Sequence, residues 1–161
     1  MLKDYIQIKT SKTADTRTSD WTKVDKETLI ASSKQHIADV TKGLHLFANL
    51  LHEAAIIHDA DKILEIDWFH NDFTHGFKDP EYTTWWTNHR KVNRHHLNKS
   101  DGVPEDVNLR DVLEYIVDCV MAGLGRAGEV YPLEMPNKVL QIAFENTVEL
   151  LINQVEVIKE D

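Results

Sequence analysis

A histidine and an aspartate stand side by side in the stretch Ala55-Ile56-Ile57-His58-Asp59-Ala60-Asp61-Lys62. An apolar helical run ends here and is followed at once by two polar groups that are costly to bury without partners. Imidazole and carboxylate groups together favour first-row transition metals over calcium or magnesium. Adjacent residues on a regular helix point about 100° apart, so both side chains can bind one ion only where the helix ends. We therefore expect a helix end at His58-Asp59.

Three more histidines follow within eight residues, namely His89, His95 and His96. A lone histidine is usually structural, but three so close together, downstream of the His-Asp pair, predict metal or phosphate binding by at least two of them. His89 and His95 are six residues apart and would lie about 240° from each other on one helix. The helix that carries His89 should therefore end near Val92-Asn93.

Asp118 lies in the middle of an apolar helical pattern, between Val117 and Cys119. An unpaired carboxylate buried there would be costly, so a positive group should lie next to it. A metal ion is one such group. A buried salt bridge, for instance to Arg126 or Lys42, is the alternative.

Three basic residues are candidates for contacts with an anionic substrate. Lys62 follows Asp59 by three residues, so on a helical turn its ammonium group would lie on the same side as the His-Asp pair. Lys62 could equally be a solvated residue at a helix end. Arg94 precedes His95, and Arg126 follows the helix of Asp118.

The apolar positions from Asp25 to Leu51 recur at steps of three and four residues and predict a long helix, with Asp25 or Thr28 as its N-cap. His36 lies beside this apolar stripe. In one straight helix His36 and His58, 22 residues apart, would be separated by about 33 Å. If His36 belongs to the same site, the chain must reverse between them, through a kink near Gly43 or a break within residues 48–53.

The pattern as a whole predicts an all-α fold, in which residues 27–161 form a helical domain and residues 1–26 an N-terminal arm with a short edge strand at Tyr5–Thr10. Further helices should begin at Asp79-Pro80-Glu81, at Asn108 and at Pro136. The helix after Asn108 should run to about Leu124. The aromatic stretch Ile66–Phe77 is read either as the mouth of a pocket or as a surface loop. The last helix, expected to include Val155, would close the bundle or form a homodimer seam.

Composition limits the classes of partner. The net charge of −9 and the lack of a basic stripe argue against binding to long nucleic acids. A small anionic substrate remains possible, because bound cations would reverse the local charge.

The single cysteine, Cys119, rules out an internal disulfide framework and reads as a small buried hydrophobic residue. With no secretion leader and no membrane span in the pattern, we expect a cytoplasmic protein, in the host cytoplasm if it is phage-encoded.

The order His36, His58-Asp59, His89, His95-His96, Asp118 resembles the HD-domain superfamily of metal-dependent phosphohydrolases over residues 34–126. The run Asn93-Arg94-His95-His96 after a tryptophan-bearing helix is similar to a poorly characterised branch met in phages and bacteria. This resemblance implies an HD-type helical bundle.

The resemblance also implies a ligand set and a reaction. One divalent transition metal (Mn, Fe, Co, Ni or Zn) would be bound by His36, His58, Asp59 and Asp118. A second ion would involve His89, His95 and His96, with Asp59 as the bridge. The substrate would be a nucleotide or another small phosphate ester, with Asp59 and Lys62 as catalytic residues. A di-iron oxygenase and a non-catalytic metal- or nucleotide-binding module remain as alternatives.

Overall fold

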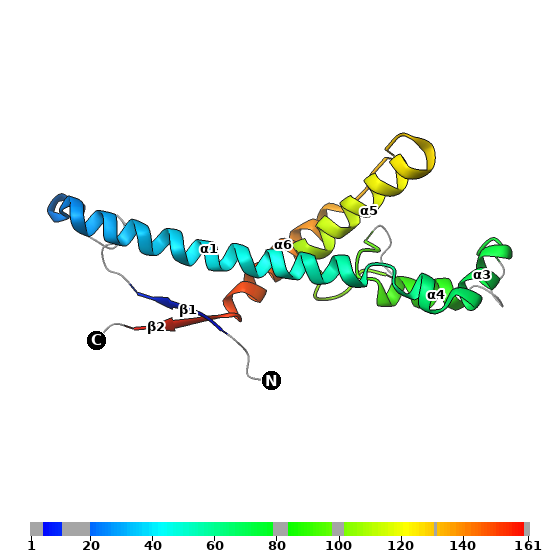
Figure 1. Cartoon of the computed structure of the whole chain (residues 1–161), viewed down its shortest axis with the longest axis horizontal. Helices are drawn as coiled ribbons and strands as arrows, with labels where there is room; N and C mark the ends of the chain where they lie inside the picture. Colours follow the sequence, from blue (N-terminus) through cyan, green and yellow to red (C-terminus); the bar gives the residue numbers. More distant parts are fainter. Residues whose placement is uncertain (1–4, 11–19, 79–83, 98–101, 131, 160–161) are drawn as a thin grey trace. The chain divides into compact units, whose positions relative to one another are not determined.

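The computed structural model describes residues 5–10, 20–78, 84–97, 102–130 and 132–159. Helices account for most of these residues, and the strands within them form a single two-stranded sheet, so the predicted all-α class is confirmed (Figure 1). The chain divides into two compact units. The first comprises Met1–Asn49 and Glu149–Asp161, and the second comprises Leu50–Val148. The second unit contains the candidate site.

The sheet belongs to the first unit and joins the two ends of the chain. Strand β1 (Ile6–Lys9) pairs in parallel with β2 (Val155–Ile158), in the register Ile6 opposite Val155. The edge strand predicted near the N-terminus is therefore present. The expectation that Val155 lies on the last helix is wrong, because α6 (Asn137–Ile152) ends three residues earlier and the chain then becomes extended. Three of the four residues from 155 to 158 are β-branched, namely Val155, Val157 and Ile158, and such residues favour a strand.

Helix α1 (Lys26–Ile57) is continuous over 32 residues. Asp25, one of the two predicted N-caps, caps its start by accepting a hydrogen bond from the backbone N–H of Thr28 at 2.7 Å. Neither the kink expected near Gly43 nor the break within residues 48–53 is present. A single interior glycine costs only about 1 kcal/mol, and residues 48–53 contain no helix breaker, so nothing interrupts the helix.

The second unit continues with two short helices, α2 (Asp61–Leu64) and α3 (Ile66–Thr74), and with α4 (Thr84–Val92). The aromatic stretch that we read as a pocket mouth or loop is thus mostly helical. Helix α4 ends at Val92, where the spacing of His89 and His95 required it to end. The helix start predicted at Asp79-Pro80-Glu81 lies outside the described residues.

Helix α5 (Leu109–Ala127) carries two of the acidic residues near the site. Asn108 caps it in a capping box with Asp111, which confirms the predicted start. The helix runs three residues past the predicted end and stops at Gly128, whose φ of 76° is the left-handed conformation that glycine adopts most easily at helix ends.

The buried core of the second unit fixes α5 next to the loop that carries His95 and His96. Leu97, Val107, Val112, Tyr115 and Ala143 form this core, and Cys119 packs against it as a half-buried residue. None of the described helices combines the length and the apolar character needed to cross a membrane.

Candidate metal centre

His58 and Asp59 follow directly after the last residue of α1. The backbone N–H of His58 still donates to the carbonyl of Ala54 at 2.8 Å, but Asp59 has a φ of 52°, which ends the helix. A positive φ at a residue other than glycine costs free energy and is common at functional sites. The side chain of Asn93 stabilises this turn, because its Oδ1 accepts a hydrogen bond from the Asp59 backbone N–H at 3.2 Å. The change of backbone direction lets both side chains point to one place.

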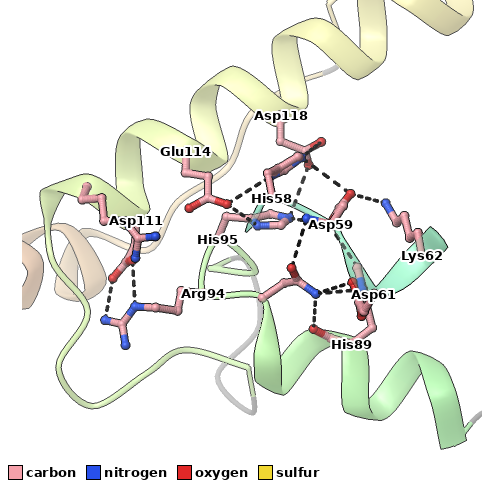
Figure 2. Close-up of polar contacts among 12 residues, drawn as sticks. His58, Asp59, Asp61, Lys62, His89, Arg94, His95, Asp111, Glu114 and Asp118 are labelled. Atoms are coloured by element: carbon pink, nitrogen blue, oxygen red, sulfur yellow. Dashed lines mark hydrogen bonds and ion pairs between the residues drawn. The ribbon is translucent and has the colours of Figure 1, made fainter. Parts of the chain in front are cut away.

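The first group of candidate ligands consists of His58, Asp59 and His95, with Asp118 beside them (Figure 2). Nε2 of His58 lies 3.6 Å from an Asp59 oxygen and 3.7 Å from an Asp118 oxygen. Nε2 of His95 lies 3.6 Å and 3.9 Å from oxygens of the same two carboxylates. These distances are too long for hydrogen bonds. They are close to the roughly 3–3.5 Å that separates neighbouring ligands on one transition-metal ion.

The second group consists of Asp59, His89 and His96. Nε2 of His89 lies 3.5 Å from Oδ1 of Asp59, and the His89 side chain is completely buried. Within the described residues, three buried atoms of this group lack any hydrogen-bond partner: Asp59 Oδ1, His89 Nε2 and His96 Nε2. Buried polar atoms are rarely left unpaired in folded proteins, so this unpaired cluster is a candidate ion site.

Two tryptophans of α4 enclose this second group. The Trp85 ring stacks on His89 with centroids 4.7 Å apart, and the Trp86 ring lies 5.3 Å from His89 and 5.6 Å from His96. Trp85 is fully buried. The indoles keep water away from one side of the imidazoles and hold their rings in place.

Glu114 orients the histidines of the first group. One oxygen, Oε1, lies 2.9 Å from Nδ1 of His58 and 3.1 Å from Nδ1 of His95. Burial raises the pKa of Glu114, but the hydrogen bonds from His95 and His58 outweigh it and hold the pKa below its ordinary value. An ionised carboxylate can only accept, so both Nδ1 atoms carry protons. The Nε2 atoms of both rings lie on the opposite side, near Asp59, and are the atoms that could bind a cation.

Asp61 orients a histidine of the second group, His89. Its Oδ2 accepts from Nδ1 of His89 at 2.8 Å, and its Oδ1 accepts from the amide of Asn93 at 3.0 Å. A carboxylate behind a metal-binding histidine fixes the ring orientation and makes the imidazole a stronger ligand. Asn93 thereby connects the turn at Asp59 with the partner of His89.

The charges of the site also suit a cation. Burial raises the pKa of Asp59. The ion pair with Lys62 and the nearby His58 and His95 together lower it by more, so the pKa of Asp59 is below its usual range. Burial, with the neighbouring His95 and His89, lowers the pKa of His96 to about 3. Asp59 is thus ionised and His96 neutral at neutral pH, which are the forms that bind metals.

The residues present could hold a metal ion. Imidazole nitrogens and carboxylate oxygens together are ligand types that proteins use for first-row transition metals. The unpaired buried atoms face one another, and a hydrogen-bonded carboxylate stands behind His58, His89 and His95. Asp59 belongs to both groups and is the residue that could bridge two ions.

Two predicted ligands, His36 and Asp118, do not have the surroundings that we expected. His36 is on helix α1, 22 residues before His58, and neither group of described candidate ligands includes it. Asp118 is beside the first group but its side chain is 31% exposed, not buried. The alternative partners proposed for Asp118 are elsewhere: Lys42 binds Asp39 and the carbonyl of Gln7.

Of the two arginines proposed as substrate contacts, Arg94 is paired with other residues of the protein and Arg126 is exposed away from the site. Arg94 forms a bidentate pair with the fully buried Asp111 at 2.8 and 2.9 Å, and its third nitrogen binds Asp106. Arg94 therefore attaches the histidine loop to α5, and its role as a substrate contact stays a prediction. Arg126 is exposed in the last turn of α5, about 12 Å beyond Asp118 along the helix. Lys62 does contact Asp59, on the side that its spacing predicted.

Sequence reasoning missed Glu114, Asp61 and Asn93. A usable signal existed for Glu114: Asp111, Glu114 and Asp118 follow one another at steps of three and four residues, which places all three on one face of a helix. Figure 2 shows these side chains extending from α5 towards Arg94, His95 and His58.

Comparisons with known proteins found no relative of this chain: no family model, curated protein or solved structure matches it.

Proposed function

We propose that the protein is a metal-dependent phosphohydrolase that acts on a nucleotide or another small phosphate ester. The observation that carries this proposal is the position of Asp59, whose carboxylate lies between two groups of histidines with unpaired, inward-facing nitrogens. One or two bound cations would satisfy these atoms. Bound there, a transition metal supplies a water of lowered pKa and polarises a phosphoryl oxygen.

The side of the site available to a substrate is the side of the first group. His58 and Asp118 are each 31% exposed and Lys62 is 28% exposed, whereas His89 and His95 are buried. A phosphate group approaching from this side meets the Lys62 ammonium next to Asp59. Lys62 would pair with a non-bridging phosphate oxygen and hold the ester against the carboxylate face of the site.

The reaction is the hydrolysis of a P–O bond. The oxygen of a water molecule forms a bond to phosphorus, the bond from phosphorus to the ester oxygen breaks, and the alcohol leaves with a proton. Lys62 offsets the negative charge that develops on the phosphoryl oxygens. Glu114 and Asp61 keep His58, His95 and His89 in the required tautomers throughout.

Metal analysis and a substrate screen test this proposal. The full-length protein would be stripped with chelator, reloaded separately with Mn²⁺, Fe²⁺, Co²⁺, Ni²⁺, Zn²⁺ or Mg²⁺, and assayed for phosphate release from nucleotides and simple esters. We expect binding of one or two transition-metal ions and turnover that is lost in His58→Ala. The matched control is His70→Ala, which removes an exposed histidine of α3.

Each other outcome has a defined meaning. Failure to retain or take up any metal would overturn the metal centre and the hydrolase with it. Metal binding without phosphate release, accompanied by oxygen consumption with Fe²⁺, would replace the hydrolase by an oxygenase. Metal binding with tight nucleotide binding and neither product would leave a non-catalytic module.

A further inference from the structure

A groove with a volume of about 530 Å³ runs between the end of α1 and the middle of α5, within the second unit. Its walls are almost entirely apolar. They are formed by Leu51, Ala54, Ala55, Leu113, Val117 and Met121. The volume falls within the usual range for small-molecule sites, which are mostly apolar with a few polar groups that fix orientation.

The polar end of the groove is the candidate metal centre itself. The remaining lining residues are His58, Glu114 and Asp118, all of which belong to the first group of ligands or support it. A molecule whose phosphate lies at this group would therefore extend its next atoms into the groove. The groove and the metal centre are parts of one continuous site.

The charge of the lining limits what the groove can hold. None of the described residues that line it is lysine or arginine, and two acidic residues, Glu114 and Asp118, stand at its polar end. A polyphosphate chain would find no cation there and would be repelled by the carboxylates. Sugar hydroxyl groups would find few donors or acceptors along walls of leucine, alanine, valine and methionine. An uncharged hydrocarbon group matches these walls.

We propose that the substrate is the phosphate monoester of an apolar alcohol, whose hydrocarbon group occupies this groove while its phosphate lies at Lys62 and the candidate metal centre. This inference rests on the proposed phosphohydrolase function and narrows its substrate class from small phosphate esters in general to alkyl or aryl phosphates. Hydrolysis would release the apolar alcohol and inorganic phosphate.

A chain-length series tests the proposal with the metal-loaded, full-length protein. Methyl, butyl and octyl phosphate share the reacting group and differ only in what enters the groove. We expect kcat/KM to rise by up to about fourfold for each methylene that becomes buried, until the groove is full. AMP should react no better than methyl phosphate.

Two charge substitutions on α5 supply matched variants. Val117→Lys places an ammonium group in the groove, whereas Leu124→Lys makes the same change at an exposed leucine that does not line it. We expect Val117→Lys to lower kcat/KM for octyl phosphate at least tenfold and to change the value for methyl phosphate less than threefold. Leu124→Lys should leave both values near wild type.

The outcomes separate this inference from the function on which it rests. Equal kcat/KM for methyl and octyl phosphate would overturn the groove proposal and leave the hydrolase intact. If no ester is hydrolysed, the proposed hydrolase function is wrong. Calorimetry of octylphosphonate and methylphosphonate binding to metal-loaded and metal-free protein then tests the groove proposal by itself. Binding of octylphosphonate that Val117→Lys abolishes would support the groove as a hydrocarbon site, and equal binding of the two phosphonates would overturn it.

Discussion

Oδ1 of Asp59 lies 3.5 Å from Nε2 of His89, and within the described residues neither of these buried atoms has a hydrogen-bond partner. Two facing acceptor atoms without a proton between them repel each other and cost free energy, unless a cation is shared by both. The relationship therefore argues for a metal more directly than the histidine content of the sequence does.

Asp59→Ala should remove all bound metal, because the Asp59 carboxylate is the ligand that both groups have in common. His89→Ala should instead lower the metal content by at most one ion. Mass spectrometry of the purified proteins measures both. Asp67→Ala, at an exposed aspartate of α3, is the matched control and should keep the wild-type content. Full metal occupancy in Asp59→Ala would contradict the assignment.

Glu114→Gln should weaken metal binding about 10- to 100-fold without removing a ligand, because an amide no longer accepts from His58 and His95 as a carboxylate does. Competition with a chromophoric chelator gives the affinity. The same change at the exposed Glu53 should have no effect. An unchanged affinity in Glu114→Gln would show that the histidine orientation does not depend on this residue.

Arg94→Ala should destabilise the protein by about 3–5 kcal/mol, because it leaves the buried Asp111 carboxylate without its bidentate partner. Arg94→Lys should restore only part of this, since an ammonium cannot form the paired geometry. Denaturant unfolding measures both. Arg126→Ala, at an exposed arginine, should change the free energy of unfolding by less than about 0.5 kcal/mol. Wild-type stability in Arg94→Ala, together with a raised KM, would return Arg94 to the substrate site.

The free energy of unfolding should fall as pH rises above about 10, partly through Tyr115. Burial, followed by the neighbouring Cys119, raises the pKa of the Tyr115 hydroxyl, which donates to the carbonyl of Glu134 at 2.8 Å. A raised folded-state pKa gives stability that is complete below the unfolded pKa and is lost above it. Unfolding experiments between pH 9 and 11 should show a smaller loss in Tyr115→Phe. An equal slope in both proteins would contradict this account.

Local rules predicted the places where elements begin and end. We predicted the ends of α1 and α4 by requiring that candidate ligands adjacent in the sequence, or six residues apart, point to one place. Asp25 and Asn108 cap helices because their side chains satisfy free backbone N–H groups. The position of Lys62 beside Asp59 follows from helical spacing in the same way. These features depend on a few neighbouring residues, so the sequence contains them.

Features that depend on distant contacts were not predictable in this way. His36 was predicted as a ligand from its place in an order of residues, but neither group of described candidate ligands includes it. Strand β2 forms only because β1, about 150 positions earlier in the sequence, offers it an edge. The role of Asp111 required knowing that Arg94 lies opposite it.

The stacking of Trp85 and Trp86 around His89 has a practical consequence. Indole fluorescence is quenched at short range by ions with unfilled d shells, such as Co²⁺ and Ni²⁺, and far less by Zn²⁺. Two of the four tryptophans of the chain are thus natural optical reporters of the second group. A titration that follows their emission would report ions entering the site, with no added label.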